Sequence, residues 1–98
     1  MPALELKFTP AFARDIKRLD KKHVDTAPLE EVLDLIALNT SEALEELRRR
    51  HRMHTLGGSW SGSSECHVCN AGDWLLIWRS TDDYAYIQRT GSHDELFR

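Results

Sequence analysis

The feature that most constrains the fold is a change in the spacing of apolar residues near Leu56. Before this point apolar side chains recur every three or four positions, which is typical of one face of an amphipathic helix. After it, short apolar and aromatic runs are separated by turn residues, which is typical of strands. Residues 57–62 contain three glycines and two serines and form the boundary. A helical first half and a strand-rich second half predict an α+β domain.

Within the first half, proline and threonine indicate where helices begin. Proline suits the first helical position, where its missing N–H would have had no partner, and a preceding threonine can cap the helix. A third, shorter helix begins at Ser41, which can cap it, and its acidic residues precede its arginines, as the helix dipole favours. The predicted elements are a strand over residues 3–8, a helix from Pro10 to about residue 23, a second helix from Pro28 to about residue 39, and the short third helix.

The second half predicts three strands joined by links short enough for antiparallel hairpins. The strands cover roughly residues 63–69, 74–79 and 84–89. The order is therefore β-α-α-(α)-β-β-β, with a helical hairpin packed on a small antiparallel sheet. At 98 residues the chain is one domain, residues 1–98, so any site must be built on a single surface.

Composition narrows the function classes. No apolar run approaches the ~20 residues of a membrane span, and the first residues lack the pattern of a signal peptide, so a cytoplasmic protein is expected. The formal charge is -3, from 13 basic and 16 acidic residues. Residues 55–98 hold three basic and six acidic residues, an unfavourable balance for binding a polyanion. Any hypothesis of nucleic-acid binding must explain this acidic balance.

Arg89 and His93 stand four residues apart, on either side of Gly91, where the last strand should end. Histidine can donate and accept protons near neutral pH, and arginine offers a fixed fork of donors to a phosphate. Strict alternation would place Arg89 on the face opposite Tyr84 and Tyr86, with a turn at residues 90–91 returning His93 toward it. The structural alternative makes Arg89 an ion-pair partner and His93 the cap of a short terminal helix.

Three upstream residues could complete a site that cuts RNA without metal. His54 is expected in a loop, His67 in a strand on the face of Glu65, and Asp73 in a turn before Trp74. Each is individually compatible with an ordinary surface or turn role. Together they supply the proton-transfer groups that attack by a ribose 2'-hydroxyl requires.

Cys66 and Cys69 form a single CxxC. One such pair supplies only two zinc ligands, and in a strand these two residues point to opposite faces. We therefore expect no metal site and no cofactor, and keep a small metal or redox protein only as a third hypothesis.

Several motifs, in order and spread over nearly the whole chain, resemble the RelE/ParE superfamily of bacterial type II toxins, and within it the YafQ-like ribosome-dependent mRNA interferases. They are His54 with Leu56, residues 58–62 (Gly-Ser-Trp-Ser-Gly), residues 65–68 (Glu-Cys-His-Val), residues 73–78 (Asp-Trp-Leu-Leu-Ile-Trp), and residues 89–93 (Arg-Thr-Gly-Ser-His) with Leu96 and Phe97.

The resemblance implies a microbial RNase-like fold, cleavage of mRNA in the ribosomal A site, and a cognate antitoxin that wraps the toxin in a hetero-oligomer. Matching positions imply acid-base roles for four residues, a phosphate-stabilising role for Arg89, and supporting or substrate-facing roles for two aromatic residues. His93 is favoured as general acid. The four are His54, His67, Asp73 and His93, the aromatic pair is Trp74 and Phe97, and Trp60 could stack on a base or fill the core.

The chain also departs from the family pattern. A basic and aromatic segment common in the family is replaced by residues 61–64, and the turn before Asp73 is longer, so Asp73 could be displaced. Arg48, Arg49 and Arg52, in and after an extended third helix, are candidates for the missing cationic surface. The alternative function is a non-enzymatic, ParE-like or degenerate member that acts by binding protein.

Overall fold

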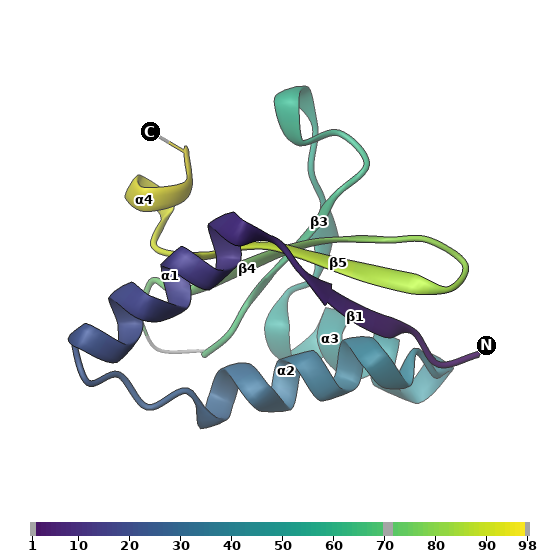
Figure 1. Ribbon diagram of the computed structural model, residues 1–98. Coiled ribbons are helices and arrows are strands. Elements are labelled where there is room, and N and C mark those ends of the chain that lie inside the picture. The colour runs from purple at the N-terminus through teal and green to yellow at the C-terminus, as the bar shows by residue number, and fades with distance from the viewer. Residues whose placement is uncertain (1, 70–71, 98) are drawn as a thin grey trace.

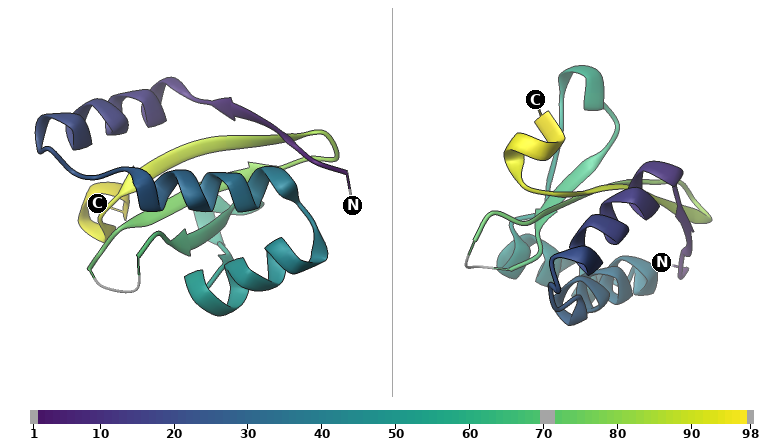
Figure 2. Two further views of the ribbon diagram at one scale, coloured as in Figure 1. Left: turned by 90° about the horizontal axis from the view of Figure 1, so that it is seen from below. Right: turned by 60° about the vertical axis from the view of Figure 1, so that its left-hand side comes forward.

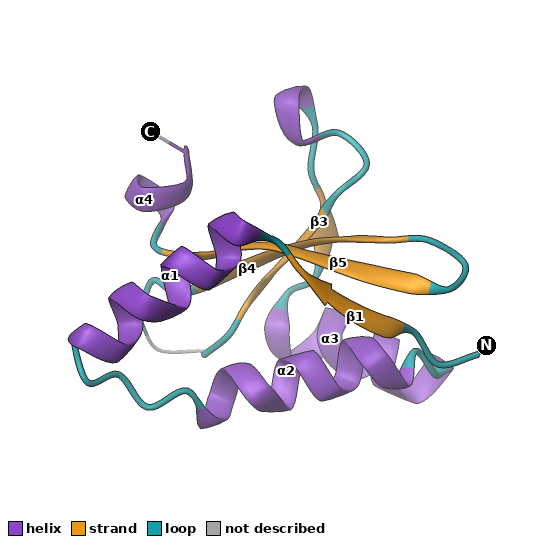
Figure 3. Cartoon of the chain, in the orientation of Figure 1, coloured by secondary structure: helices purple, strands orange, loops and turns teal. Residues whose placement is uncertain are grey.

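The computed structural model describes residues 2–69 and 72–97. Helices dominate the first half of this part of the chain and strands the second (Figures 1 and 3). In chain order the elements are β1 (Glu5–Phe8), α1 (Pro10–Lys21), α2 (Ala27–Leu38), α3 (Ser41–His51), β2 (His54–Thr55), the 3-10 helix η1 (Gly58–Trp60), β3 (Ser64–His67), β4 (Leu75–Ser80), β5 (Tyr84–Gly91) and α4 (His93–Phe97).

The strands form one five-stranded sheet in the order β1-β5-β4-β3-β2. The predicted α+β class is confirmed, and β3, β4 and β5 pair antiparallel as expected. The short elements β2, η1 and α4 were not in the predicted order. The sheet is nevertheless mixed, because β1 pairs parallel to β5. Part of the predicted link between β3 and β4, residues 70 and 71, lies outside the described residues.

Helices α2 and α3 cover one face of the sheet, which we call the helix face (Figures 1 and 2). Apolar side chains from both helices pack there against alternate residues of the strands. Because each such side chain contributes about 2 kcal/mol when fully buried, this layer holds the fold together. Its buried members include Val32, Ile36, Leu47, Cys66, Leu76, Trp78, Ala85 and Ile87.

The opposite face, which we call the open face, has only a small cover. Buried Leu75 and Ile77 of β4 pack there with Leu96 of α4, and half-buried Trp60 of η1 lies against them. Figure 1 shows the η1 loop and α4 rising from this side of the sheet. The polar residues of the open face are therefore framed by two small elements rather than by a helical layer.

Helix α1 lies beside the end of β5 that β1 does not reach. The Thr9 N–H donates to the carbonyl of Ile87 at 3.1 Å, and the Thr9 hydroxyl donates to the carbonyl of Gln88 at 2.9 Å. Further along, the Thr90 N–H donates to the carboxylate of Asp15 at 3.0 Å. Groups of Thr9 and of α1 thus take the place of a strand partner, because buried backbone groups need hydrogen bonds.

The starts of α1 and α2 follow the threonine and proline signals, but the Thr26 side chain makes no capping hydrogen bond to α2. Thr9 caps α1, its hydroxyl accepting from the Phe12 N–H at 3.1 Å, and Pro10 is the first helical residue. For α3 the prediction was one residue off: the cap is Thr40, which accepts from Ala43, and not Ser41. A threonine in extended backbone conformation directs its hydroxyl at the unpaired N–H groups of the first turn.

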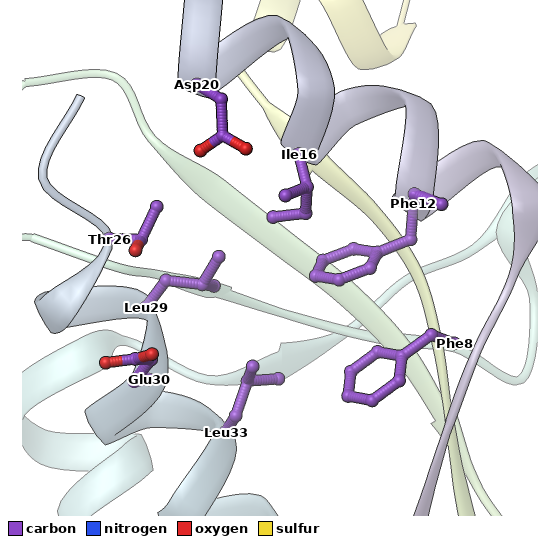
Figure 4. Close-up of a pocket in the computed structure, with 9 residues that line it drawn as sticks. Phe8, Phe12, Ile16, Asp20, Thr26, Leu29, Glu30 and Leu33 are labelled. Atoms are coloured by element: carbon purple, nitrogen blue, oxygen red, sulfur yellow. The ribbon is translucent and has the colours of Figure 1, made fainter. Parts of the chain in front are cut away.

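A groove of about 370 Å³ separates α1 from α2. Figure 4 shows Phe8, Phe12, Ile16 and Leu33 lining it, with the carboxylates of Asp20 and Glu30 near its edge. It contains none of the predicted site residues. An apolar groove bordered by carboxylates does not suit a polyanion such as RNA, because RNA binding depends on cations that replace its counterions.

Candidate catalytic site

The strand register places four residues in one row across the open face. His54 pairs with Glu65, Glu65 with Ile77, and Ile77 with Arg89. Residues paired across a sheet share a face, and Ile77 packs on the open face. His54 therefore lies in a short strand, not in the loop expected for it, and it shares a face with Arg89 although 35 positions separate them in the chain.

Arg89 reaches this face because of an irregularity in β5. The register pairs Trp78 with Ile87 but Ile77 with Arg89, so one extra residue, Gln88, is inserted in β5. Strict alternation from Tyr86 predicted Arg89 on the opposite face, and this was wrong. The bulge inverts the alternation, and Arg89 ends on the same face as Arg79 and Tyr86.

A second row brings His67 and His93 together. His67 pairs with Leu75, and Leu75 pairs with Gly91, the last residue of β5. The chain leaves the sheet after Gly91, not at a turn over residues 90–91, and α4 begins at His93. The ring centroids of His67 and His93 are 6.4 Å apart. The predicted grouping of these two histidines is thus present in the structure.

The Asp73 carboxylate contacts His93 at two groups, the backbone N–H and the imidazole ring. It accepts from the His93 backbone N–H at 3.1 Å and contacts the ring Nδ1 at 2.7 Å. The longer turn before Asp73 therefore does not separate the two residues. The helix itself is capped by Ser92, whose hydroxyl accepts from the Glu95 N–H at 3.2 Å, and not by His93 as the structural alternative supposed.

The Asp73 contact determines which nitrogen of His93 is available. The hydrogen bond from the His93 ring, together with the one from its backbone, holds the pKa of Asp73 below its usual value. An ionised carboxylate only accepts hydrogen bonds, so Nδ1 must carry a proton. The other nitrogen, Nε2, has no hydrogen-bond partner within the described ranges, and the side chain is 58% exposed. Nε2 can therefore exchange a proton with a ligand.

Arg89 is held by Asp15 of α1. Its Nε donates to Oδ2 at 2.7 Å and its Nη2 to Oδ1 at 3.0 Å. These hydrogen bonds raise the pKa of Arg89, so its charge is permanent. Nη1 has no partner in the part of the chain that the structure describes, and the side chain is 26% exposed. Arg89 and His93 make no direct hydrogen bond there: Asp15 holds Arg89, at what we call the buried end of the site, and Asp73 holds His93, at what we call the exposed end.

Glu65 was not among the predicted site residues. It is only 4% exposed, its Oε1 lies 3.3 Å from Nε2 of His54, and its Oε2 has no partner among the described residues. Such a buried carboxylate ordinarily requires a compensating group. The sequence did contain a signal for Glu65: it belongs to the Glu-Cys-His-Val segment and shares a strand face with His67.

The three aromatic candidates divide between the two faces. Phe97 is 43% exposed and lies 6.1 Å from the His93 ring and 6.5 Å from Trp60, between ring centroids. Trp74 packs with the helix-face core, and its indole N–H donates to the Thr90 hydroxyl at 2.9 Å. Trp60 and Phe97 are thus accessible from the site, whereas Trp74 supports the strand beneath it.

The three arginine candidates lie away from both rows. Helix α3 is on the helix face, where Arg48 pairs with Glu45 and Arg49 has no ion pair within the described residues. Arg52 follows this helix, and its carbonyl lies 2.9 Å from Nδ1 of His54. Only Arg52 touches a site residue, and it does so through its backbone.

Both cysteines pack with the helix-face core, not on opposite faces as predicted, because β3 ends at His67, before Cys69. Cys66 is fully buried on the helix face, and burial raises the pKa of its thiol to about 12. Cys69 is also a free thiol. Over residues 2–69 and 72–97 no group of three metal-ligating side chains is suitably placed to hold an ion. No described helix is both long and apolar enough to cross a membrane.

Fold and site together define a small α+β protein with histidines, a carboxylate and an arginine on an open sheet face. Residues 4–98 match the family model described as the bacterial toxin of type II toxin-antitoxin systems, YafQ. The chain belongs to this family. It is 32% identical to the mRNA interferase toxin YafQ of Escherichia coli K12 over 93 residues, 95% of each chain.

Solved structures agree with the sequence match. The crystal structure of YafQ from E. coli BL21(DE3) matches with a TM-score of 0.83 and 30% identity, over 97% of this chain and 99% of that one. YafQ in the E. coli DinJ-YafQ toxin-antitoxin complex matches with a TM-score of 0.82 and 31% identity, over 98% and 99%. The resemblance to YafQ-like toxins noted from the motifs is confirmed.

Proposed function

We propose that the protein is the toxin of a type II toxin-antitoxin system and cleaves mRNA on the ribosome, in the cytoplasm, without a metal ion or other cofactor. The observation that carries this proposal is the open face itself. It carries His54 and Arg89 at opposite ends of one paired row, and His67 in the neighbouring row with the His93 ring 6.4 Å from it. The relatives' names as mRNA interferases support the same activity.

The reaction is attack by a ribose 2'-hydroxyl on the adjacent phosphorus. A base removes the proton of the 2'-hydroxyl, the new O–P bond forms, the P–O5' bond breaks, and an acid protonates the departing 5'-oxygen. The products are a 2',3'-cyclic phosphate and a 5'-hydroxyl. Proton transfers of this kind typically contribute about 10²–10⁴-fold each to the rate.

Side-chain roles follow from the contacts. His93 acts as general acid through Nε2, because Asp73 fixes the proton on Nδ1. Arg89 stabilises the charge that develops on the phosphate, using the Nη1 side of its guanidinium. The base is His54 or His67. Trp60 and Phe97 are positioned to stack on an unpaired base, as aromatic residues of RNA-binding proteins do.

The acidic balance of residues 55–98 fits a toxin whose substrate is presented by the ribosome. Such an enzyme does not need a broad basic surface to capture free RNA, since the ribosome holds the mRNA in place. We also propose an antitoxin partner, because the solved DinJ-YafQ complexes contain relatives of this fold bound to an antitoxin. A toxin-antitoxin hetero-oligomer is therefore expected.

Inducible expression with primer-extension mapping of mRNA ends tests the proposal. The wild type is expected to arrest growth and create new mRNA ends, and His93→Ala and Arg89→Ala to abolish both. Matched controls are His23→Ala and Arg14→Ala, two exposed residues without ion pairs in the described chain. Growth arrest without new ends would replace the nuclease with the alternative, a ParE-like toxin that acts by binding a protein target.

A further inference from the structure

Asp15 is a buried carboxylate for which neither the family resemblance nor the reaction described above supplies a role. It lies in the middle of α1, is 2% exposed, and belongs to none of the sequence motifs. Isolated ionised carboxylates are costly to bury, so each contact that compensates it is informative. Its hydrogen-bond partners all lie in the candidate site or next to it.

Four hydrogen bonds converge on this carboxylate. Two come from Arg89 at 2.7 and 3.0 Å, one from the Thr90 backbone N–H at 3.0 Å, and one from Nη1 of Arg18 at 3.1 Å. Burial alone would raise the pKa of Asp15, but the bonds from Arg89, Thr90 and Arg18 together lower it. Asp15 is thus ionised and fully occupied, and cannot itself meet a substrate.

The geometry of the Arg89 contact is directional. Asp15 takes the Nε and Nη2 edge of the guanidinium in a paired arrangement, which fixes the plane of the group. This leaves Nη1 without a partner in the described residues. An arginine side chain otherwise has many rotamers, and ordering it on substrate binding would cost about 1–2 kcal/mol of conformational free energy.

Arg18 also links Asp15 to α4, the helix that begins at His93. Its Nε pairs with Glu95 of α4 at 2.7 Å, and its Nη2 donates to the Thr90 carbonyl at 3.3 Å. This arrangement needs Gly91, because a Cβ there would lie 2.8 Å from the Glu95 carboxylate and 3.0 Å from the Arg18 guanidinium. One helix therefore contacts Arg89 directly and the His93 helix through an ion pair.

We infer that Asp15 is a positioning residue for the reaction: it presents Arg89 to the scissile phosphate in a fixed orientation. The inference rests on the proposed mRNA cleavage and on the role given there to Arg89. Asp15 does not touch the substrate, and its contribution passes entirely through the arginine.

The test compares Asp15→Asn, Arg89→Gln and the double variant in cleavage of a short mRNA programmed on purified ribosomes. Asp15→Asn is expected to lower kcat by about tenfold to a hundredfold with little change in KM, since misplacing a reacting group affects the transition state most. The double variant should be no slower than Arg89→Gln alone. Asp20→Asn makes the same charge change at an exposed position of α1 and serves as the control.

The outcomes separate the inference from the proposed function. If Arg89→Gln keeps full activity, the proposed role of Arg89 fails and Asp15 loses its function with it. If Arg89→Gln is inactive but Asp15→Asn cleaves at the wild-type rate, only the inference about Asp15 is overturned. Losses that multiply in the double variant would also overturn it, because independent defects add in free energy.

A second measurement applies to the wild type and remains decisive should Asp15→Asn fail to fold. In ¹⁵N-labelled protein, the Nε–H of Arg89, assigned by its absence in Arg89→Lys, should exchange with solvent about tenfold more slowly than the Nε–H of exposed Arg79 or Arg49. Equal exchange would show that the paired contact does not persist in solution and would contradict the inference.

Discussion

The two ends of the candidate site are held in opposite ways. At one end Arg89 is bound to a carboxylate that is almost completely buried, and it belongs to a contact with α1 that includes Thr90 and Arg18. At the other, His93 and Asp73 form an exposed pair whose side chains are 58% and 50% accessible. The difference suits the two proposed roles: a residue that binds the phosphate must be fixed in place, whereas a proton donor must be accessible to the substrate.

The comparison is tested most strongly at the exposed end. His93→Ala removes the proposed acid, and cleavage of ribosome-bound mRNA should fall by about a thousandfold, within the range of general acid catalysis. Thermal stability should change little, because the side chain is exposed. His23→Ala is the matched control. Retention of more than about a tenth of the wild-type rate would remove His93 from the acid role.

At the buried end the loss of activity should come with a loss of stability. Arg89→Ala removes the proposed hydrogen-bond donor to the phosphate, and loss of one such donor typically costs about a hundredfold in rate. It also leaves Asp15 buried with fewer partners, so the melting temperature should fall, unlike that of His93→Ala. Equal melting temperatures for the two variants, measured by circular dichroism, would break the contrast between the ends.

The stability contribution of Asp15 should depend on pH. Asp15→Asn is expected to lower the free energy of unfolding at pH 7 by about 2 kcal/mol, a factor of about thirty in the unfolding equilibrium. Because the pKa of Asp15 is lowered in the folded state, its stabilising effect is full above the unfolded value of about 4 and is lost as the pH falls through the folded value. Urea titrations at pH 7, 5 and 3 should show the difference from wild type shrinking only at pH 3.

The smallest effect is expected from Asp73. Asp73→Asn keeps the size of the side chain but removes the charge that fixes the proton on Nδ1 of His93. Since the pair is exposed and screened by solvent, cleavage should slow by only about fivefold. Single-turnover rates on programmed ribosomes measure it. A loss as large as that of His93→Ala would mean that Asp73 takes part in the chemistry itself.

Much of this arrangement could be predicted from the residues. The change of apolar spacing near Leu56 and the proline signals gave the class and the order of elements, because both reflect local preferences of the backbone. The motifs also identified His67, Asp73 and His93, which the structure brings together. The parallel pairing of β1 with β5 joins distant parts of the chain, and local patterns carry no such information.

Other features depended on details that periodicity does not contain. The insertion of Gln88 reverses the side of the sheet on which Arg89 lies, and one irregular residue has no clear signature in an alternating pattern. No sequence motif singles out Asp15, and its burial arises from packing against β5. Glu65 was not predicted as a site residue, because its neighbours in the row come from other strands and are distant in the sequence.

The central claim is that the open face cleaves RNA by attack of a 2'-hydroxyl. The most direct measurement uses purified ribosomes programmed with an mRNA that carries a single 2'-deoxynucleotide on the 5' side of the mapped cleavage point, with the all-ribose mRNA beside it. The account predicts 2',3'-cyclic phosphate ends on the all-ribose mRNA and no cleavage at the substituted linkage. Cleavage of the substituted linkage at an undiminished rate would contradict it.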